Sequence, residues 1–212
     1  LGVSVLSRAP GGVVHRYFAL FSWSVAVWTL SNGLALAYPE VPWRDIWPRL
    51  AFAAASVIPL AFLQLASVFP TSTPSAPRVV LLTFIAAGAG VFCVSFTGLI
   101  VRGTTIVDGA LRLMYGPLHL PFGVYFVSCF GFSLVLLVRK HRVLTGSQRL
   151  QLRYLLLGVS IAAAGATISN LFIPLLFQTS EFSGYGPLFS IFMIGMIGHT
   201  IIRHRLLDIR VV

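Results

Sequence analysis

The sequence predicts an all-α protein, a polytopic membrane bundle of about six spanning helices preceded by the stump of another. The first observation is composition: only 9% of the 212 residues are charged, 57% are hydrophobic, and the mean hydropathy is +0.91. A water-exposed surface needs more polar side chains than this chain has. The second is distribution: six stretches of 21 to 28 residues carry no Asp, Glu, Lys or Arg. Each stretch can cross the hydrocarbon core at about 1.5 Å per residue, so each predicts one span.

The predicted helices follow one another between these charges. The first span begins after Arg16 and ends before the Pro39–Pro42 turn, and the second contains Pro59, which predicts a kink. A Pro/Ser/Thr loop leads to the third span, and the longest connection, Arg102–Pro117, leads to the fourth. The basic loop Arg139–Arg153 precedes the fifth, and a Ser/Gly turn precedes the sixth. The expected spans are residues 17–38, 50–70, 79–101, 118–138, 154–178 and 187–202, in a single transmembrane domain covering residues 1–212.

The Lys and Arg residues predict the orientation. The loops on the same side as both chain ends carry 11 of them, and the loops on the opposite side carry 4. Cytoplasmic loops are enriched in Lys and Arg, so we expect both ends to be cytoplasmic. The net charge of +10 then lies on the cytoplasmic face, against anionic lipid, and we assign it no nucleic-acid role.

The residues give no indication of an enzyme. We find no hydrolase elbow, phosphate-binding glycine loop or zinc-binding histidine pair, and we expect no metal and no cofactor. Cys93 and Cys129 both fall inside apolar spans, where we interpret them as packing residues. The spans contain no Asp, Glu, Lys or Arg, which argues against a proton-coupled transporter.

Uncharged polar residues show a bias toward the predicted outer face, where Asn32, Ser95, Thr97, Asn170 and Gln178 lie in the outer halves of their spans. One interpretation is hydrogen bonding between helices. The other is an outward-facing pocket for a small or lipid-like ligand. The candidate residues for the pocket are Trp43, Trp47, Asp108, Tyr115, His119 and Asn170. The tryptophans and Tyr115 are also the residue types that anchor helices at the membrane interface, so both interpretations stay open.

The end of the chain predicts a route by which a signal could leave the membrane. Seven residues recur at alternating spacings of four and three, namely Leu188, Phe192, Gly195, His199, Ile202, Leu206 and Ile209. That alternation is typical of a coiled-coil seam, so we expect a continuous helix that enters the cytoplasm over residues 203–212 and pairs with a second copy in a parallel homodimer. The alternative is that the stripe packs within its own bundle, and His199 is then a neutral side chain near the interface.

The order of segments resembles the N-terminal seven-helix membrane region of bacterial sensor histidine kinases. The stretches that carry the resemblance are Arg16–Ser22 with Trp28, Trp47–Leu50 with Pro59 and Phe69–Pro70, Tyr115–Leu118, Gln148–Gly158, and Arg203–Ile209. All but a stump of the first helix, Leu1–Ser7, is missing, so we expect the chain to have been trimmed at its front. The phosphoacceptor histidine box and the nucleotide-binding glycine boxes of a kinase domain are absent.

The resemblance implies a non-catalytic sensory input module in the bacterial inner membrane. Such a module detects a signal at or in the membrane and relays it through its last helix to a cytoplasmic output domain, such as a histidine kinase. The alternative is a small transporter or channel subunit, which should show inverted repeats or broken helices near mid-membrane. The resemblance supplies no ligand residues.

Overall fold

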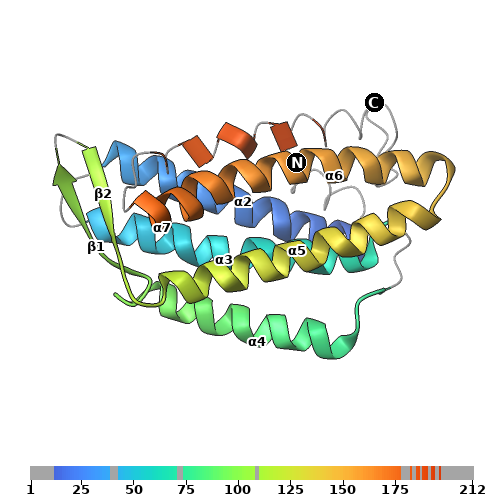
Figure 1. The fold of residues 1–212 in the computed structure, drawn as a ribbon, viewed down its shortest axis with the longest axis horizontal. Helices are drawn as coiled ribbons and strands as arrows, with labels where there is room; N and C mark the ends of the chain where they lie inside the picture. The colour runs from blue at the N-terminus through green and yellow to red at the C-terminus, as the bar shows by residue number, and fades with distance from the viewer. Residues whose placement is uncertain are drawn as a thin grey trace.

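The computed structural model describes residues 12–38, 43–70, 74–107, 110–177, 182, 185–186, 188–190, 192–193 and 196. Five helices in this part of the chain are long and apolar enough to cross a membrane, which confirms the predicted bundle (Figure 1). The elements in chain order are α2 (Val13–Ala37), the 3₁₀ turn η1 (Trp43–Asp45), α3 (Ile46–Val68), α4 (Arg78–Ser95), β1 (Val101–Val107), β2 (Ala110–Tyr115), α5 (His119–Val143), α6 (Gly146–Thr167), the π-helical turn η2 (Ile168–Phe172) and α7 (Ile173–Phe177).

The helices extend beyond the predicted spans on the side of the basic loop. Helix α5 continues to Val143 and α6 begins at Gly146, so most of the expected loop Arg139–Arg153 is helical. Long basic side chains can reach water from helix ends, and a helix need not stop where the charges begin. Gly146 makes the short turn possible, because its φ of 59° lies in the left-handed region that other residues avoid.

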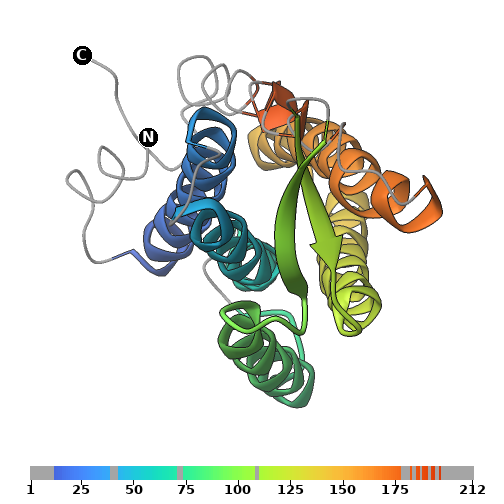
Figure 2. The same cartoon turned by 90° about the vertical axis from the view of Figure 1, so that its left-hand side faces the viewer.

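Helix α3 lies at the centre of the bundle. It packs against α2, α4 and α5, and its side chains Phe62 and Leu63 are fully buried (Figure 1). Its many alanines let the neighbouring helices approach closely. Helix α4 lies at the periphery against α3 and α5, and most of its apolar side chains face outward, as expected for a helix in contact with lipid (Figure 2).

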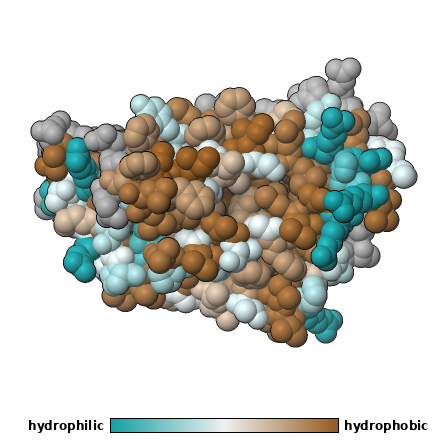
Figure 3. All heavy atoms as spheres, viewed as in Figure 1, coloured by the Kyte–Doolittle hydropathy of each residue, from teal (hydrophilic) through white to brown (hydrophobic). Residues whose placement is uncertain are grey.

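The charged side chains collect at the two ends of the bundle. At one end, where α5 turns into α6, lie Arg16, Arg78, Arg139, Lys140, Arg142, Arg149 and Arg153. We call this the basic end. At the other end, which we call the hairpin end, lie Arg44, Arg49, Arg102, Arg112 and Asp45, with β1 and β2. An apolar surface separates the hydrophilic ends (Figure 3).

The connection Arg102–Pro117, predicted as a loop, contains most of a β-hairpin. Strands β1 and β2 pair antiparallel, with Val107 opposite Ala110. Strand β1 is rich in β-branched residues, and Leu111, Leu113 and Tyr115 occupy alternate positions of β2. The hairpin lies across the end of the bundle (Figure 2).

Hydrogen bonds tie the hairpin to the helices. The Thr104 hydroxyl of β1 donates to Oδ1 of Asp45 over 2.6 Å, which joins the hairpin to η1 at the start of α3. The backbone N–H groups of Gly116 and Leu118 donate to the carbonyl oxygens of Ile100 and Leu99, over 2.8 and 2.9 Å. The hairpin is therefore anchored to η1 through β1, and its two ends are joined to each other beside α5.

Candidate ligand cavity at the hairpin end

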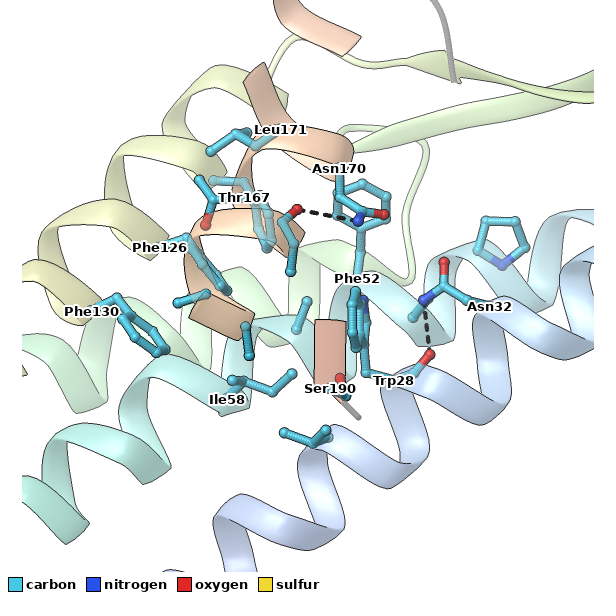
Figure 4. Close-up of a pocket in the computed structure, with 18 of the residues that line it drawn as sticks. Trp28, Asn32, Phe52, Ile58, Phe126, Phe130, Thr167, Asn170, Leu171 and Ser190 are labelled. Carbon is cyan, nitrogen blue, oxygen red and sulfur yellow. Dashed lines mark hydrogen bonds between the residues drawn. The ribbon is translucent and has the colours of Figure 1, made fainter. Parts of the chain in front are cut away.

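A cavity of about 320 Å³ opens inside the bundle toward the hairpin end (Figure 4). Its volume lies at the lower end of the range of about 300–1,000 Å³ seen for small-molecule pockets. Helices α2, α3, α5 and α6, the turn η2, strand β2 and the described residues Ser190 and Met193 all contribute to its wall. The cavity therefore joins segments from the beginning, middle and end of the chain.

Each helix presents one stripe of residues to the cavity, at spacings of one, three and four that place them on one helix face. The stripe of α2 consists of Phe21, Val25, Trp28, Asn32, Ala35 and Leu36, and that of α3 of Pro48, Ala51, Phe52, Ala55 and Ile58. The stripe of α6 consists of Val159, Ala162, Ala163, Ala166 and Thr167, and continues through η2 with Asn170 and Leu171. The small alanine side chains leave the volume of the cavity unfilled, and the larger side chains form its walls.

A column of aromatic rings forms one wall. Phe122, Phe126 and Phe130 follow one another at every fourth residue of α5, with ring centroids 6.2 and 5.8 Å apart. The Phe52 ring of α3 meets Phe122 edge-on at 5.1 Å, and the Phe130 ring stacks on Phe62 at 4.7 Å. Such contacts hold the rings in place, so this wall is preorganised.

Strand β2 closes the cavity at the hairpin end. Leu111, Leu113 and Tyr115 line it, because alternate residues of a strand point to the same face. Met114, on the other face, is 44% exposed. The Tyr115 hydroxyl is buried and has no hydrogen-bond partner among the described residues. Burial also raises the pKa of this hydroxyl, so it stays a hydrogen-bond donor.

Apart from Ser190, the polar lining residues gather toward the hairpin end. Asn32 lies near the end of α2, and Thr167 and Asn170 lie where α6 passes into η2 (Figure 4). The lining at the other end of the cavity is apolar, with Phe21, Phe130 and Val159. No Asp, Glu, Lys or Arg of the described ranges lines the cavity. The site thus has a polar end, an apolar end and no charge.

The final described segment closes one side of the cavity. Ser190 and Met193 line it and are buried, whereas Leu188 and Phe192 are 53% and 57% exposed. The segment packs closely on α6, because a Cβ added at Gly165 would collide with the Phe189 ring. One face of this segment therefore touches the cavity, and the opposite face points away from the bundle.

The structure brings only part of the predicted site together. Tyr115 and Asn170 line the cavity, and His119 stands behind it, with its ring centroid 4.1 Å from that of Tyr115. Trp47 lies in the first turn of α3 and is not a lining residue. Asp108 and the side chain of Trp43 lie outside what the structure describes. The same holds for the predicted output residues His199, Ile202, Leu206 and Ile209, and for residues 203–212.

The predicted site did not include several of the lining residues. Among them are the large side chains of Trp28, Phe52 and the three α5 phenylalanines. The four-residue spacing of Phe122, Phe126 and Phe130 was visible, but the same spacing marks any packed helix face. Within the described ranges no three His, Cys, Asp or Glu side chains come together as a metal site.

Comparison with known proteins gives one family. The family described as the N-terminal 7TM region of histidine kinase matches residues 1–210 of the chain. The match therefore covers the helices, the hairpin and the cavity alike. No curated protein and no protein of solved structure matches.

Proposed function

Because the chain belongs to the family of N-terminal seven-helix regions of histidine kinases, we propose that it senses a ligand in the cavity and relays its presence to a cytoplasmic output domain. The family supports a membrane-embedded sensory input module without catalysis of its own. The output domain is then a histidine kinase attached beyond the last helix, which would carry the signal.

One observation carries the proposal, namely that the final described segment is part of the cavity wall. Ser190 and Met193 would touch a bound molecule, while Leu188 and Phe192 on the opposite face would not. A ligand that fits one arrangement of this segment better than another shifts the population toward that arrangement. The segment leads toward the end of the chain, so its movement would pass to whatever follows.

The charges support an orientation for this relay. Among the described residues, the basic end carries seven Lys and Arg residues and the hairpin end carries four. The basic end then faces the cytoplasm of the bacterial cell, and the hairpin end faces outward. The cavity would therefore receive a ligand in the outer half of the membrane, and the partners of the chain would be lipid, a second copy and the output domain.

Filling the cavity tests the proposal. In the natural full-length protein in native membranes, we expect Ala163→Leu and Ala166→Leu to mimic occupancy. They should change ATP-dependent histidine phosphorylation by about threefold or more. Ala164→Leu is the matched control, because Ala164 lies on the same helix but is exposed and does not line the cavity.

All three variants should insert and melt like the parent protein, which separates a signalling effect from misfolding. Equal phosphorylation in the two cavity variants, the control and the parent would refute the proposal.

A further inference from the structure

The two asparagines of the cavity have hydrogen-bonding capacity left over. The Asn32 amide donates to the Trp28 carbonyl oxygen over 2.8 Å, and the Asn170 amide donates to Ser169 Oγ over 2.9 Å and to the Ala166 carbonyl oxygen over 3.2 Å (Figure 4). These bonds hold both side chains to their own helices. They leave each amide oxygen without a partner among the described residues, and Asn32 with a second N–H.

Tyr115 adds a donor at the same end of the cavity. Its buried hydroxyl can donate one hydrogen bond, and the asparagine oxygens can accept two. A molecule that satisfies all three must both accept and donate hydrogen bonds at one end. A primary amide does this, and a hydrocarbon does not.

The shape of the cavity favours a chain over a ring system. On α6 and η2 the lining runs from Val159 to Asn170, which corresponds to about 16 Å along a helix. A volume of about 320 Å³ spread over this length leaves a narrow channel. The rings of Phe126 and Phe130 border its apolar end, where a hydrocarbon chain would be removed from water.

The lining also selects against charge. No acidic or basic side chain of the described ranges lines the cavity, and the His119 ring stands behind Tyr115. A buried charge without a partner is costly, because the ion loses its hydration and gains nothing in return. An ionised fatty acid or an alkylammonium ion would therefore bind poorly.

From these features we propose that the cavity binds a neutral, single-chain amphipathic molecule. Its hydrogen-bonding head lies between Asn32, Asn170 and Tyr115, and its chain runs past Trp28 toward Phe130. Ser190 and Met193 of the final segment both line the cavity, so such a molecule contacts this segment. This inference rests on the proposed function, because it names the ligand class of the same cavity.

Trp28 provides a direct test. We would replace Trp23, Trp43 and Trp47 by Phe in the present chain, place it in zwitterionic nanodiscs, and measure quenching of Trp28 fluorescence. The probes are a terminally brominated undecanamide and its permanently charged sulfonate and trimethylammonium counterparts. We expect saturable quenching by the amide and half-saturation at least about tenfold weaker with either charged probe.

Matched variants separate the cavity from the lipid. A variant that keeps only Trp23, which is 52% exposed, should show the same non-saturable quenching with all three probes. Ala166→Leu should abolish the saturable quenching of Trp28, and Ala164→Leu should preserve it. Asn32→Leu should weaken binding of the brominated amide about fivefold. It should leave binding of a brominated alkane, which has no polar head, unchanged.

Charged probes that bind as tightly as the amide, or amide quenching that survives Ala166→Leu, would overturn the inference. So would the absence of saturable amide quenching. The phosphorylation test uses no probe, so its result is separate: a change there without amide binding rejects only the ligand class. Amide binding without that change rejects the proposed function.

Discussion

At the scale of single residues, Lys140 makes the most concentrated set of contacts at the basic end. Its ammonium group donates to the carbonyl oxygens of Ala66, Ser67 and Phe69 over 2.9, 2.8 and 2.7 Å. These carbonyls belong to the C-terminus of α3, where no further helical N–H is available to them and where the helix dipole favours a cation. Lys140 therefore joins the end of α5 to the end of the central helix.

We expect Lys140→Met to destabilise the chain by about 2 kcal/mol, because hydrogen bonds to a charged group are worth about 1.5–3 kcal/mol. The Ala66 and Phe69 carbonyls would lose the Lys140 donor, whereas the Ser67 carbonyl keeps the two donors of Ser75. Thermal unfolding in detergent measures the change. Arg142→Met is the control, since Arg142 is exposed and also lies in the last turn of α5. If both variants melt together with the parent chain, the Lys140 contacts do not stabilise the fold.

The same scale shows what the sequence could reveal about the cavity. Asn170 and Tyr115 were predicted because polar and amphipathic residues are uncommon in such a chain, and both line the site. The Phe122 wall could not be singled out, because a phenylalanine facing a cavity and one facing lipid have the same composition and spacing. Trp47 was predicted for its residue type, yet it is not a lining residue, whereas the adjacent Pro48 is.

At the scale of elements, the contact between α3, α4 and α5 depends on one glycine. The Tyr125 hydroxyl of α5 donates to the Ser56 carbonyl oxygen of α3 over 2.8 Å, near Pro59 of the same helix. Gly88 of α4 lies over this bond, and a Cβ there would come within 2.6 Å of the hydroxyl. Helix α4 can therefore approach only because this residue has no side chain.

We expect Gly88→Ala to cost about 1–2 kcal/mol, because the added methyl group must displace a hydrogen-bonded tyrosine or the helix itself. The cost should fall by about half in a Tyr125→Phe background, which removes the colliding oxygen. Gly90→Ala is the matched control, since a Cβ there meets nothing within 4 Å. The free energy of unfolding of each variant is measured in detergent. An equal loss of stability in Gly88→Ala and Gly90→Ala would contradict the close approach of α4.

The hairpin shows why an element can be missed in a membrane chain. Asp108-Gly109 is a dipeptide typical of two-residue hairpin connections, and Leu111, Leu113 and Tyr115 alternate as strand residues do. Both patterns were present, but the segment was too short and too polar to span and was therefore interpreted as a loop. Its place over the cavity depends on the Asp45–Thr104 bond, which joins residues 59 positions apart and has no local pattern.

At the scale of the whole molecule, the bundle was predictable because lipid excludes charge. The spacing of the charges alone indicated the five long helices of the described residues, although α6 begins at Gly146, eight residues before the predicted span, and α4 ends at Ser95, six residues before its predicted end. The arrangement of the helices around α3 and the cavity between them was not predictable. It depends on which alanines and glycines meet across helices, as Gly165 meets Phe189, and one sequence does not record such pairs.

The proposed orientation predicts opposite accessibility for the two ends. After Cys93 and Cys129 are replaced by Ala, Met114→Cys at the hairpin end should react with a membrane-impermeant maleimide in intact cells. Val143→Cys, which is 83% exposed at the basic end, should react only after the membrane is permeabilised. Reaction of Val143→Cys in intact cells would reverse the orientation and exclude a cytoplasmic output at that end.

The final segment predicts how two copies meet. Leu188 and Phe192 are the first residues of the predicted seam, and both are more than half exposed among the described residues. We propose that their outward face pairs with a second copy, whereas the adjacent Met193, 5% exposed, faces the cavity. In a parallel dimer, identical seam residues of the two copies lie opposite each other.

Cysteine variants at adjacent positions of this segment should therefore differ sharply in how readily they form disulfide-linked dimers in membranes. In the Cys93→Ala, Cys129→Ala background, we expect Phe192→Cys to form disulfide-linked dimers several-fold more readily than Met193→Cys. Leu82→Cys on α4, 64% exposed, controls for random collision, because it is lipid-facing but belongs to no seam. If Leu82→Cys dimerises as well as Phe192→Cys, the outward face of the final segment contacts lipid alone. The ligand signal would then have to leave through a single copy.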